Sequence, residues 1–277
     1  MMVVIFLAML GLIWIAAATI QDLKKREVAN WISFSLIAFA LGFRFFYSLF
    51  SDKGFAFLYE GLIGLGIFFV LGNLFYYGRL FAGGDAKLFI SLGPIISFSE
   101  SSFINLKIFA VFLLIFLISG AFYGLVWSVA LALKHKKEFK KEFYKISLKN
   151  KNLFLLIMAF GLVIMFAGFF QAILFFLGAV IFIFPYFYLY AKAVDESCMI
   201  KKIKVSELIE GDWLYKDLIV GREKIKADWE GLTKDEIRKL RRRYKQVLIR
   251  QGIPFVPVFL IAFLVLIIGY FGGFGFL

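Results

Sequence analysis

Residues 103–133 read FINLKIFAVFLLIFLISGAFYGLVWSVALAL, and the eight residues that follow read KHKKEFKK. The first stretch holds one charged residue, Lys107, whereas the second holds five lysines. About 20 predominantly apolar residues are enough for a helix to cross the hydrocarbon core of a bilayer. The change from an apolar run to a lysine-rich segment therefore predicts a membrane-spanning helix that ends at a membrane surface.

The rest of the chain also alternates between long apolar runs and charged segments. Of its 277 residues, 62% are hydrophobic and 18% are charged, and the mean hydropathy is +0.88. A soluble domain is only about half apolar, so this composition argues against a water-soluble enzyme. We expect an all-α polytopic membrane protein with about eight transmembrane helices, within a range of six to eight. The candidate spans are residues 2–20, 31–50, 56–77, 86–98, 103–133, 153–169, 171–192 and 254–276.

The basic residues predict the orientation of these helices. Of 32 lysines and arginines, 29 lie in four segments, residues 21–30, 78–87, 134–152 and 192–252. The positive-inside rule places these segments on the cytoplasmic side of the cell membrane, with both termini outside. No basic residue precedes the first apolar run, which favours a retained helix over a cleaved signal peptide. The net charge of +13 is then a topology signal, and no nucleic-acid partner is expected.

One charged segment is long enough for a small domain. Residues 233–236 (TKDE) have the pattern of a helix N-terminal capping box. We expect a basic amphipathic helix to follow, with Val247 and Leu248 on its apolar face. Lying on the cytoplasmic membrane surface is the favoured role of this helix, and reading a substrate is the alternative. The expected organisation is transmembrane helices in 1–133, a basic cytoplasmic loop in 134–152, a transmembrane hairpin in 153–192, a small cytoplasmic domain in 193–252 and a last transmembrane helix in 253–277.

The cysteine and histidine counts limit the possible chemistry. With Cys198 as the one cysteine, the chain can form no intrachain disulfide and no cysteine-rich zinc site. With His135 as the one histidine, it has no multi-histidine metal site. We therefore expect neither a metal nor another cofactor.

Two acidic residues at the ends of predicted spans are the candidate catalytic groups. Asp22 lies at the cytoplasmic end of the first span and Asp85 at the cytoplasmic start of the fourth. Two adjacent carboxyls can share a proton, so that one activates water while the other polarises a peptide carbonyl and protonates the leaving amine. The simpler explanations are that Asp85 only caps a helix and that Asp22 is only an interfacial charge.

Three motifs carry a resemblance to a known family. Residues 21–32 (QDLKKREVANWI) resemble the first active-site motif of type IV prepilin peptidases. Residues 83–88 (GGDAKL) resemble the second, the GxGD motif with a lysine two residues on. Residues 251–257 (QGIPFVP) are similar to archaeal preflagellin (prearchaellin) peptidases. The chain departs from the family pattern at Ala82, which replaces the first glycine of GxGD, and in its predicted eight spans rather than six.

The resemblance implies an intramembrane aspartyl endopeptidase with Asp22 and Asp85 as the catalytic pair. Such an enzyme removes the short basic leader from type IV pilin-like or archaellin precursors at the cytoplasmic membrane face. Its partners would be these precursors and membrane lipid. The sequence assigns neither a particular precursor nor an oligomeric state, and nothing in it supports N-methyltransferase activity.

Four more positions are candidate substrate-binding or supporting residues. Gly83 and Gly84 lack side chains, so they let an extended substrate backbone approach closely and tolerate unusual dihedral angles. Glu27 could attract the basic leader or instead pair with a neighbouring cation. Lys87 could orient a carboxylate, although a role as an interfacial anchor is favoured.

Two other function classes use the same features. A proton-coupled secondary transporter could use Asp22 and Asp85 as proton sites, although both lie at span ends rather than near the bilayer midplane. A non-catalytic membrane scaffold could use the basic loops to bind a partner. Precursor cleavage that depends on both aspartates separates the three classes.

Overall fold

The computed structural model describes residues 2–51, 54–221 and 223–273. Helices make up most of the described chain, and the expected helical, multi-pass membrane fold is confirmed. The chain divides into two compact units, Met1–Leu125 with Ile253–Leu277, and Val126–Gly252. The division falls within one long helix and reunites the C-terminal helix with the N-terminal ones.

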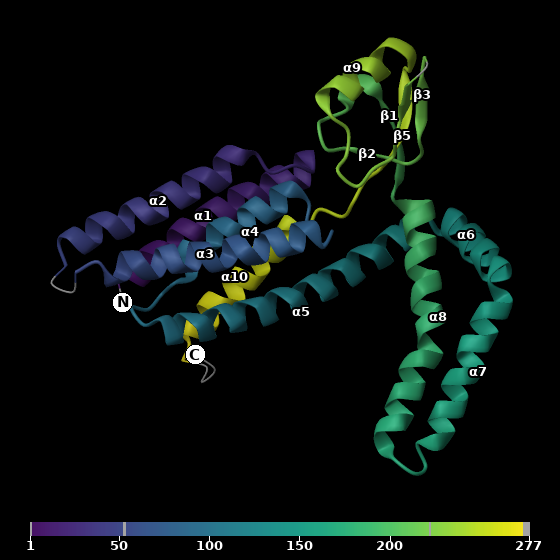
Figure 1. The fold of residues 1–277 in the computed structure, drawn as a ribbon, viewed down its shortest axis with the longest axis horizontal. Helices are drawn as coiled ribbons and strands as arrows, with labels where there is room; N and C mark the ends of the chain where they lie inside the picture. Colours follow the sequence, from purple (N-terminus) through teal and green to yellow (C-terminus); the bar gives the residue numbers. More distant parts are fainter. Residues whose placement is uncertain (1, 52–53, 222, 274–277) are drawn as a thin grey trace. The chain divides into compact units, whose positions relative to one another are not determined.

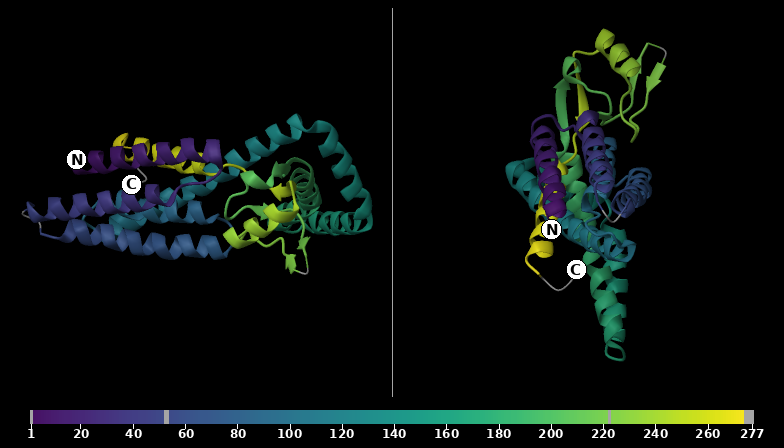
Figure 2. Two further views of the ribbon diagram at one scale, coloured as in Figure 1. Left: turned by 90° about the horizontal axis from the view of Figure 1, so that it is seen from above. Right: turned by 90° about the vertical axis from the view of Figure 1, so that its left-hand side faces the viewer.

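The first unit is a bundle of helices (Figures 1 and 2). The predicted site lies at one end of this bundle. Within it, α1 and α10 run side by side in opposite directions, and α3 packs on α4. The described elements of this unit are α1 (Met2–Lys25), α2 (Asn30–Leu49), α3 (Ala56–Tyr77), α4 (Gly83–Ile96), most of α5 (Ser102–Lys134) and α10 (Val256–Phe271).

The structure reaches the lower end of the expected range of six to eight spans. Within the described ranges, five helices are long and apolar enough to cross a membrane, and a sixth span results if the bent pair α6 and α7 counts as one. The predicted fourth and last spans correspond to α4 and α10, which have 14 and 16 residues. At about 1.5 Å per residue both are shorter than a hydrocarbon core of about 30 Å. Apolar runs therefore located both helices: the shortness of the fourth was predicted, whereas the last helix ends at Phe271, earlier than expected.

Glycines hold α3 and α4 in close contact. A Cβ added at Gly64 would lie 2.6 Å from the carbonyl oxygen of Gly93, which leaves no room for one. Beside this contact, the rings of Phe68 and Phe89 stack with centroids 4.7 Å apart. The close packing places α4, and with it Asp85, against the core of the unit.

A buried arginine donates hydrogen bonds to backbone carbonyl oxygens at the end of α4. Arg44 of α2 is fully buried, and its guanidinium donates to the carbonyl oxygens of Pro94 (2.8 Å), Phe57 (2.7 Å) and Ser97. The last carbonyls of a helix have no partner within it, and a bilayer offers no water to replace one. The buried Glu60 carboxylate is near enough to stabilise the positive charge of Arg44. This contact lets α4 end inside the bundle.

The second unit joins a helical hairpin to a small β-containing subdomain. Gly161 and Gly178 allow α7 and α8 to approach, because a Cβ at Gly161 would lie 3.0 Å from the Gly178 carbonyl oxygen. Residues 134–152, expected to form a loop, contain α6. The elements are α6 (Lys136–Lys149), α7 (Lys151–Ala167), α8 (Ala172–Cys198), β1 (Ile200–Lys204), the 3₁₀ turn η1 (Val205–Glu207), β2 (Trp213–Leu214), β3 (Leu218–Val220), β4 (Glu223–Ile225), α9 (Lys234–Arg243) and β5 (Gln246–Arg250).

The β-containing subdomain, residues 200–250, has its own apolar core. Strands β1, β5 and β2 form an antiparallel sheet in that order, and β3 pairs with β4. Thr233 and Glu236 form the expected capping box at the start of α9. The apolar residues Ile237 and Leu240 of α9 are buried in this core, so that face of the helix is not free to enter a membrane.

The basic helix is shorter than expected. It ends at Arg243, and residues 246–250 form strand β5 instead. In β5 the side chains of Val247 and Ile249 are buried whereas Leu248 is exposed, which is the two-residue period of a strand. The apolar spacing fitted a helix as far as Tyr244, and pairing with β1 decided the rest.

Candidate active site

Asp22 and Asp85 meet at one end of the first unit. Asp22 lies in the last turn of α1, and Asp85 lies in the first turn of α4. The C-terminal ends of α1 and α3 and the starts of α2, α4 and α10 gather at this end (Figure 1). The two carboxyls are near enough for the charge of Asp22 to act on Asp85. Residues that are 63 positions apart thus share one site.

The last helix holds Asp22. The Asp22 side chain is 6% exposed, and its Oδ2 accepts a hydrogen bond of 3.0 Å from the backbone N–H of Val256. The N–H of Phe255 also interacts with this carboxyl. Val256 is the first residue of α10, and the positive end of a helix dipole stabilises a carboxylate. The motif at residues 251–257 therefore contributes backbone donors to the site.

The local backbone also holds Asp85. Asp85 is the third residue of α4, and its half-buried carboxyl interacts with the backbone N–H of Ala82, the residue before the helix. Asp85 is therefore in the first turn rather than at the cap itself. Ala82 has φ −71° and ψ 161°, extended values that any L-residue adopts. An alanine in place of the first glycine of GxGD is thus compatible with this turn.

Gly83 and Gly84 adopt no unusual dihedral angles, and a Cβ at either position would make only ordinary van der Waals contacts. Neither has a φ in the left-handed region, so the expected conformational role is not found. Gly84 faces Val28, and a Cβ there would lie 3.5 Å from the Val28 Cβ. Both glycines remain partly exposed.

Lys87 joins the two motifs. Its Nζ donates to the Asn30 side-chain oxygen at 2.8 Å, which links α4 to the first residue of α2. The Gln21 side chain accepts from the backbone N–H of Ala29 at 2.9 Å and braces the turn between α1 and α2. Glu27 is exposed in that same turn. Lys87 thus holds a neutral partner rather than a carboxylate.

The sequence reasoning missed three groups that the fold brings to the site: Asn30, the Val256 N–H and Tyr123. Tyr123 of α5 is half-buried and lies within electrostatic reach of both Asp22 and Arg26. Signals existed for Asn30, which lies within the motif at residues 21–32, and for the last helix, since Pro257 in its first turn fits a helix start at this place. Nothing local in the sequence points to Tyr123.

The site offers two carboxyls, backbone donors and a hydroxyl. Within the described ranges, no three histidine, cysteine, aspartate or glutamate side chains gather as a metal site would require. A pair of interacting carboxyls beside small residues can exchange a proton with water and with a peptide bond.

Comparison with known proteins finds similarity to peptidases in this region. Residues 9–129 match the Type IV leader peptidase family, and this range contains both aspartates. A preflagellin peptidase of Methanococcus maripaludis (strain C6 / ATCC BAA-1332) is 28% identical over 121 residues, covering 41% of this chain and 52% of the relative. The match thus spans about half the length of that curated relative. No solved structure matches the chain.

Proposed function

Because residues 9–129 match the type IV leader peptidase family, we propose that this protein is an intramembrane aspartyl endopeptidase with Asp22 and Asp85 as its catalytic pair. Its substrates in this proposal are type IV pilin-like or archaellin precursors, from which it removes the short basic leader. The observation that carries the proposal is the approach of two carboxyls from α1 and α4, each held by backbone N–H groups.

The proposed reaction needs the two carboxyls in different protonation states. The ionised carboxyl takes a proton from a water molecule, which attacks the carbonyl carbon of the scissile peptide bond. The protonated carboxyl donates a hydrogen bond to the carbonyl oxygen and later gives its proton to the leaving amine. Interaction between the two groups favours one shared proton, since ionising both would place like charges together.

The substrate backbone would lie extended beside Asp85. A peptide bond inside a helix is shielded and already hydrogen-bonded, so cleavage requires local unwinding. The partly exposed Gly83 and Gly84 leave room for that strand. Glu27 is an exposed anion in the neighbouring turn and is proposed to attract the basic leader.

We place this site at the cytoplasmic membrane face. The turns around it carry Lys24, Lys25, Arg26 and Arg79, and the two lysines and Arg79 are exposed. Cationic loops of membrane proteins are retained on the cytoplasmic side. A leader that precedes an apolar helix would reach the carboxyls from that side.

The test is cleavage of a pilin-like or archaellin precursor by the full-length protein in liposomes. We expect Asp22→Asn and Asp85→Asn each to lower the cleavage rate by about 10² to 10⁴, the range that general acid–base groups contribute. Asp235→Asn is the matched control, because Asp235 is an exposed carboxylate in α9. It should leave the rate unchanged.

Two outcomes would contradict the proposal. Cleavage that survives either site substitution would rule out the pair as the catalytic groups. If the unmodified protein cuts no precursor of this class, a proton flux through the liposome membrane that requires both aspartates would instead support a proton-coupled transporter.

A further inference from the structure

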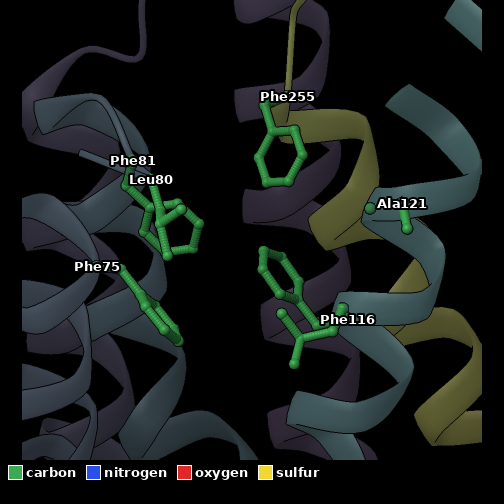
Figure 3. Close-up of a pocket in the computed structure, with 8 residues that line it drawn as sticks. Phe75, Leu80, Phe81, Phe116, Ala121 and Phe255 are labelled. Atoms are coloured by element: carbon green, nitrogen blue, oxygen red, sulfur yellow. The ribbon is translucent and has the colours of Figure 1, made fainter. Parts of the chain in front are cut away.

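The two units present surfaces of opposite character. The first unit holds an apolar pocket of about 180 Å³ whose lining residues are all apolar (Figure 3). In the second unit, positive charge is concentrated on and around α6. Residues 134–151 contain eight lysines and only two glutamates, a net charge of +6. Because this charge lies on a helix rather than in a loop, the faces of that helix decide what the charge can meet.

One face of α6 packs against α8. The ring of Phe139 lies 5.7 Å from the ring of Tyr190, beside a buried cluster that includes Val194 and Cys198. From Ala172, where α8 begins after the hairpin turn, a rise of about 1.5 Å per residue places Tyr190 about 27 Å along the helix. A hydrocarbon core is about 30 Å thick. The contact with α6 therefore lies near the level at which α8 leaves the hydrocarbon.

The bend between α6 and α7 sets the direction of α6. The two helices are joined at Asn150 with a bend of 76°. The 17 apolar-rich residues of α7 rise about 25 Å, which is close to the thickness of the hydrocarbon core. A helix that leaves a membrane-crossing helix at this angle runs nearly along the membrane surface.

The opposite face of α6 combines cations with two exposed apolar side chains. Lys137, Lys141, Tyr144 and Leu148 follow one another at steps of four, three and four residues, so they share one face of the helix. Tyr144 is 66% exposed and Leu148 is 56% exposed. Lysine stems can lie along apolar surface while their ammonium groups reach polar headgroups. This is the pattern of a helix that lies in a membrane interface.

The ion pairs of the second unit distinguish α6 from the other basic helix. In α9, Lys234, Arg238 and Lys239 each pair with a carboxylate of the same subdomain. Within the part of the chain that the structure describes, no acidic side chain forms a salt bridge with Lys137, Lys140 or Lys141 of α6, and all three are exposed. Their charge is therefore available to an external anion.

We propose that the outer face of α6, formed by Lys137, Lys140, Lys141, Tyr144 and Leu148, binds the headgroups of anionic phospholipids. The ammonium groups contact lipid phosphates, and Tyr144 and Leu148 enter the interface between headgroups and acyl chains. Positive charge next to a membrane surface attracts anionic lipids, so the face selects them over zwitterionic ones. The inference goes beyond the proposed function and does not depend on it.

The test reads lipid contact from a fluorophore on this face of the full-length protein in liposomes. In a Cys198→Ala background, Leu148→Cys carries a bimane label. Phosphatidylcholine liposomes contain the same small fraction of a nitroxide-labelled lipid, either phosphatidylglycerol or phosphatidylcholine, with the nitroxide just below the headgroup. We expect the anionic quencher to reduce the fluorescence at least about twofold more than the zwitterionic one, because α6 enriches anionic lipid around itself.

The charge on α6 should account for this preference. The triple variant Lys137→Gln, Lys140→Gln and Lys141→Gln should quench equally with the two labelled lipids. Higher ionic strength should weaken the preference of the unmodified helix in the same direction.

The matched control removes the same net charge from the β-containing subdomain. Lys224→Gln, Lys234→Gln and Lys239→Gln replace lysines that already pair with carboxylates. This control should keep the preference for the anionic quencher. Thermal unfolding of both triple variants shows that the comparison is made between folded proteins.

Three results would overturn the proposal. Equal quenching of the unmodified α6 face by the two lipids would show that it does not select anionic headgroups. A label that neither lipid quenches would place the face against water or another protein. Loss of the preference in the control as well as in the α6 variant would assign it to net charge alone. None of these results depends on precursor cleavage.

Discussion

At the scale of the residue, the environment of the Asp22 carboxyl depends on distant parts of the chain. It ends α1, where an acidic side chain faces the negative end of its own helix dipole. Its carboxyl nevertheless lies against the positive end of α10, where Val256 donates to it from 234 residues away. A buried carboxylate without such a donor would be costly. The bond from Val256 orients the Oδ2 atom.

We expect removal of the Val256 N–H to slow cleavage. Replacing this amide by an ester deletes the donor and keeps the side chain. A hydrogen bond to a charged group contributes about 1.5–3 kcal/mol, so kcat should fall about tenfold or more while KM stays close to its original value. Steady-state kinetics on the precursor measure both constants.

The control is an ester at Val258, whose N–H donates to the Phe255 carbonyl at 3.0 Å in the first turn of α10 and not to a carboxyl. Equal losses from the two esters, or a change in KM alone, would show that the Val256 donor only supports helix folding.

At the scale of elements, α4 is a helix that could not be stable in a membrane without partners from the rest of the bundle. It is too short to span a bilayer, and it ends where its carbonyls need partners. Arg44 supplies those partners from α2, and the glycines at 64 and 93 bring α3 against it. The position of Asp85 therefore depends on contacts at both ends and along the length of one short helix.

Gly64→Val tests this dependence. Its side chain would collide with the carbonyl group of Gly93 and with Ser97, so α4 must shift away from α3. Overpacking of this kind costs about 1–3 kcal/mol. We expect a lower thermal unfolding temperature and a large loss of precursor cleavage, because Asp85 moves with α4.

Gly66→Val is the matched control, since it lies on the same helix and a Cβ there meets nothing within 4 Å. It carries the same cost in helix propensity. If both variants lose stability and activity alike, close packing of α3 on α4 does not position Asp85.

At the scale of the whole molecule, charge and hydropathy divide the chain between membrane and water. The basic segments flank apolar helices in the first unit, and the second unit carries a β-containing subdomain with its own core. Arg250 at the end of β5 pairs with Asp195 and Glu196 in the last turn of α8, which ties that subdomain to its hairpin. The proposed topology puts all basic segments on one side.

Single cysteines can report this topology. In a Cys198→Ala background, Lys25→Cys and Lys201→Cys should react with a membrane-impermeant thiol reagent only from the cytoplasmic side. Ser102→Cys, at the exposed start of α5, should react only from the opposite side. Labelling of oriented vesicles, intact and opened, measures the side of each residue. Reaction of Lys25→Cys from outside would contradict the cytoplasmic placement of the site.

Local patterns predicted the features that depend on neighbouring residues. Apolar runs located the membrane helices, and residues 233–236 located a helix start that the structure confirms. The end of α10 and the strand at β5 were predicted wrongly. Each of these depends on a partner far away in the chain, such as the β1 residues that pair with β5.

The sequence by itself determined the helical membrane character, the basic segments and the motifs that contain Asp22 and Asp85, because hydropathy and charge act over a few residues. Only the tertiary structure decided that the start of α10 holds Asp22 and that Arg44 donates to the last carbonyls of α4. Hydrogen bonds and packing contacts form only between groups that the fold brings close together. No local pattern specifies which distant backbone N–H will meet a given carboxyl.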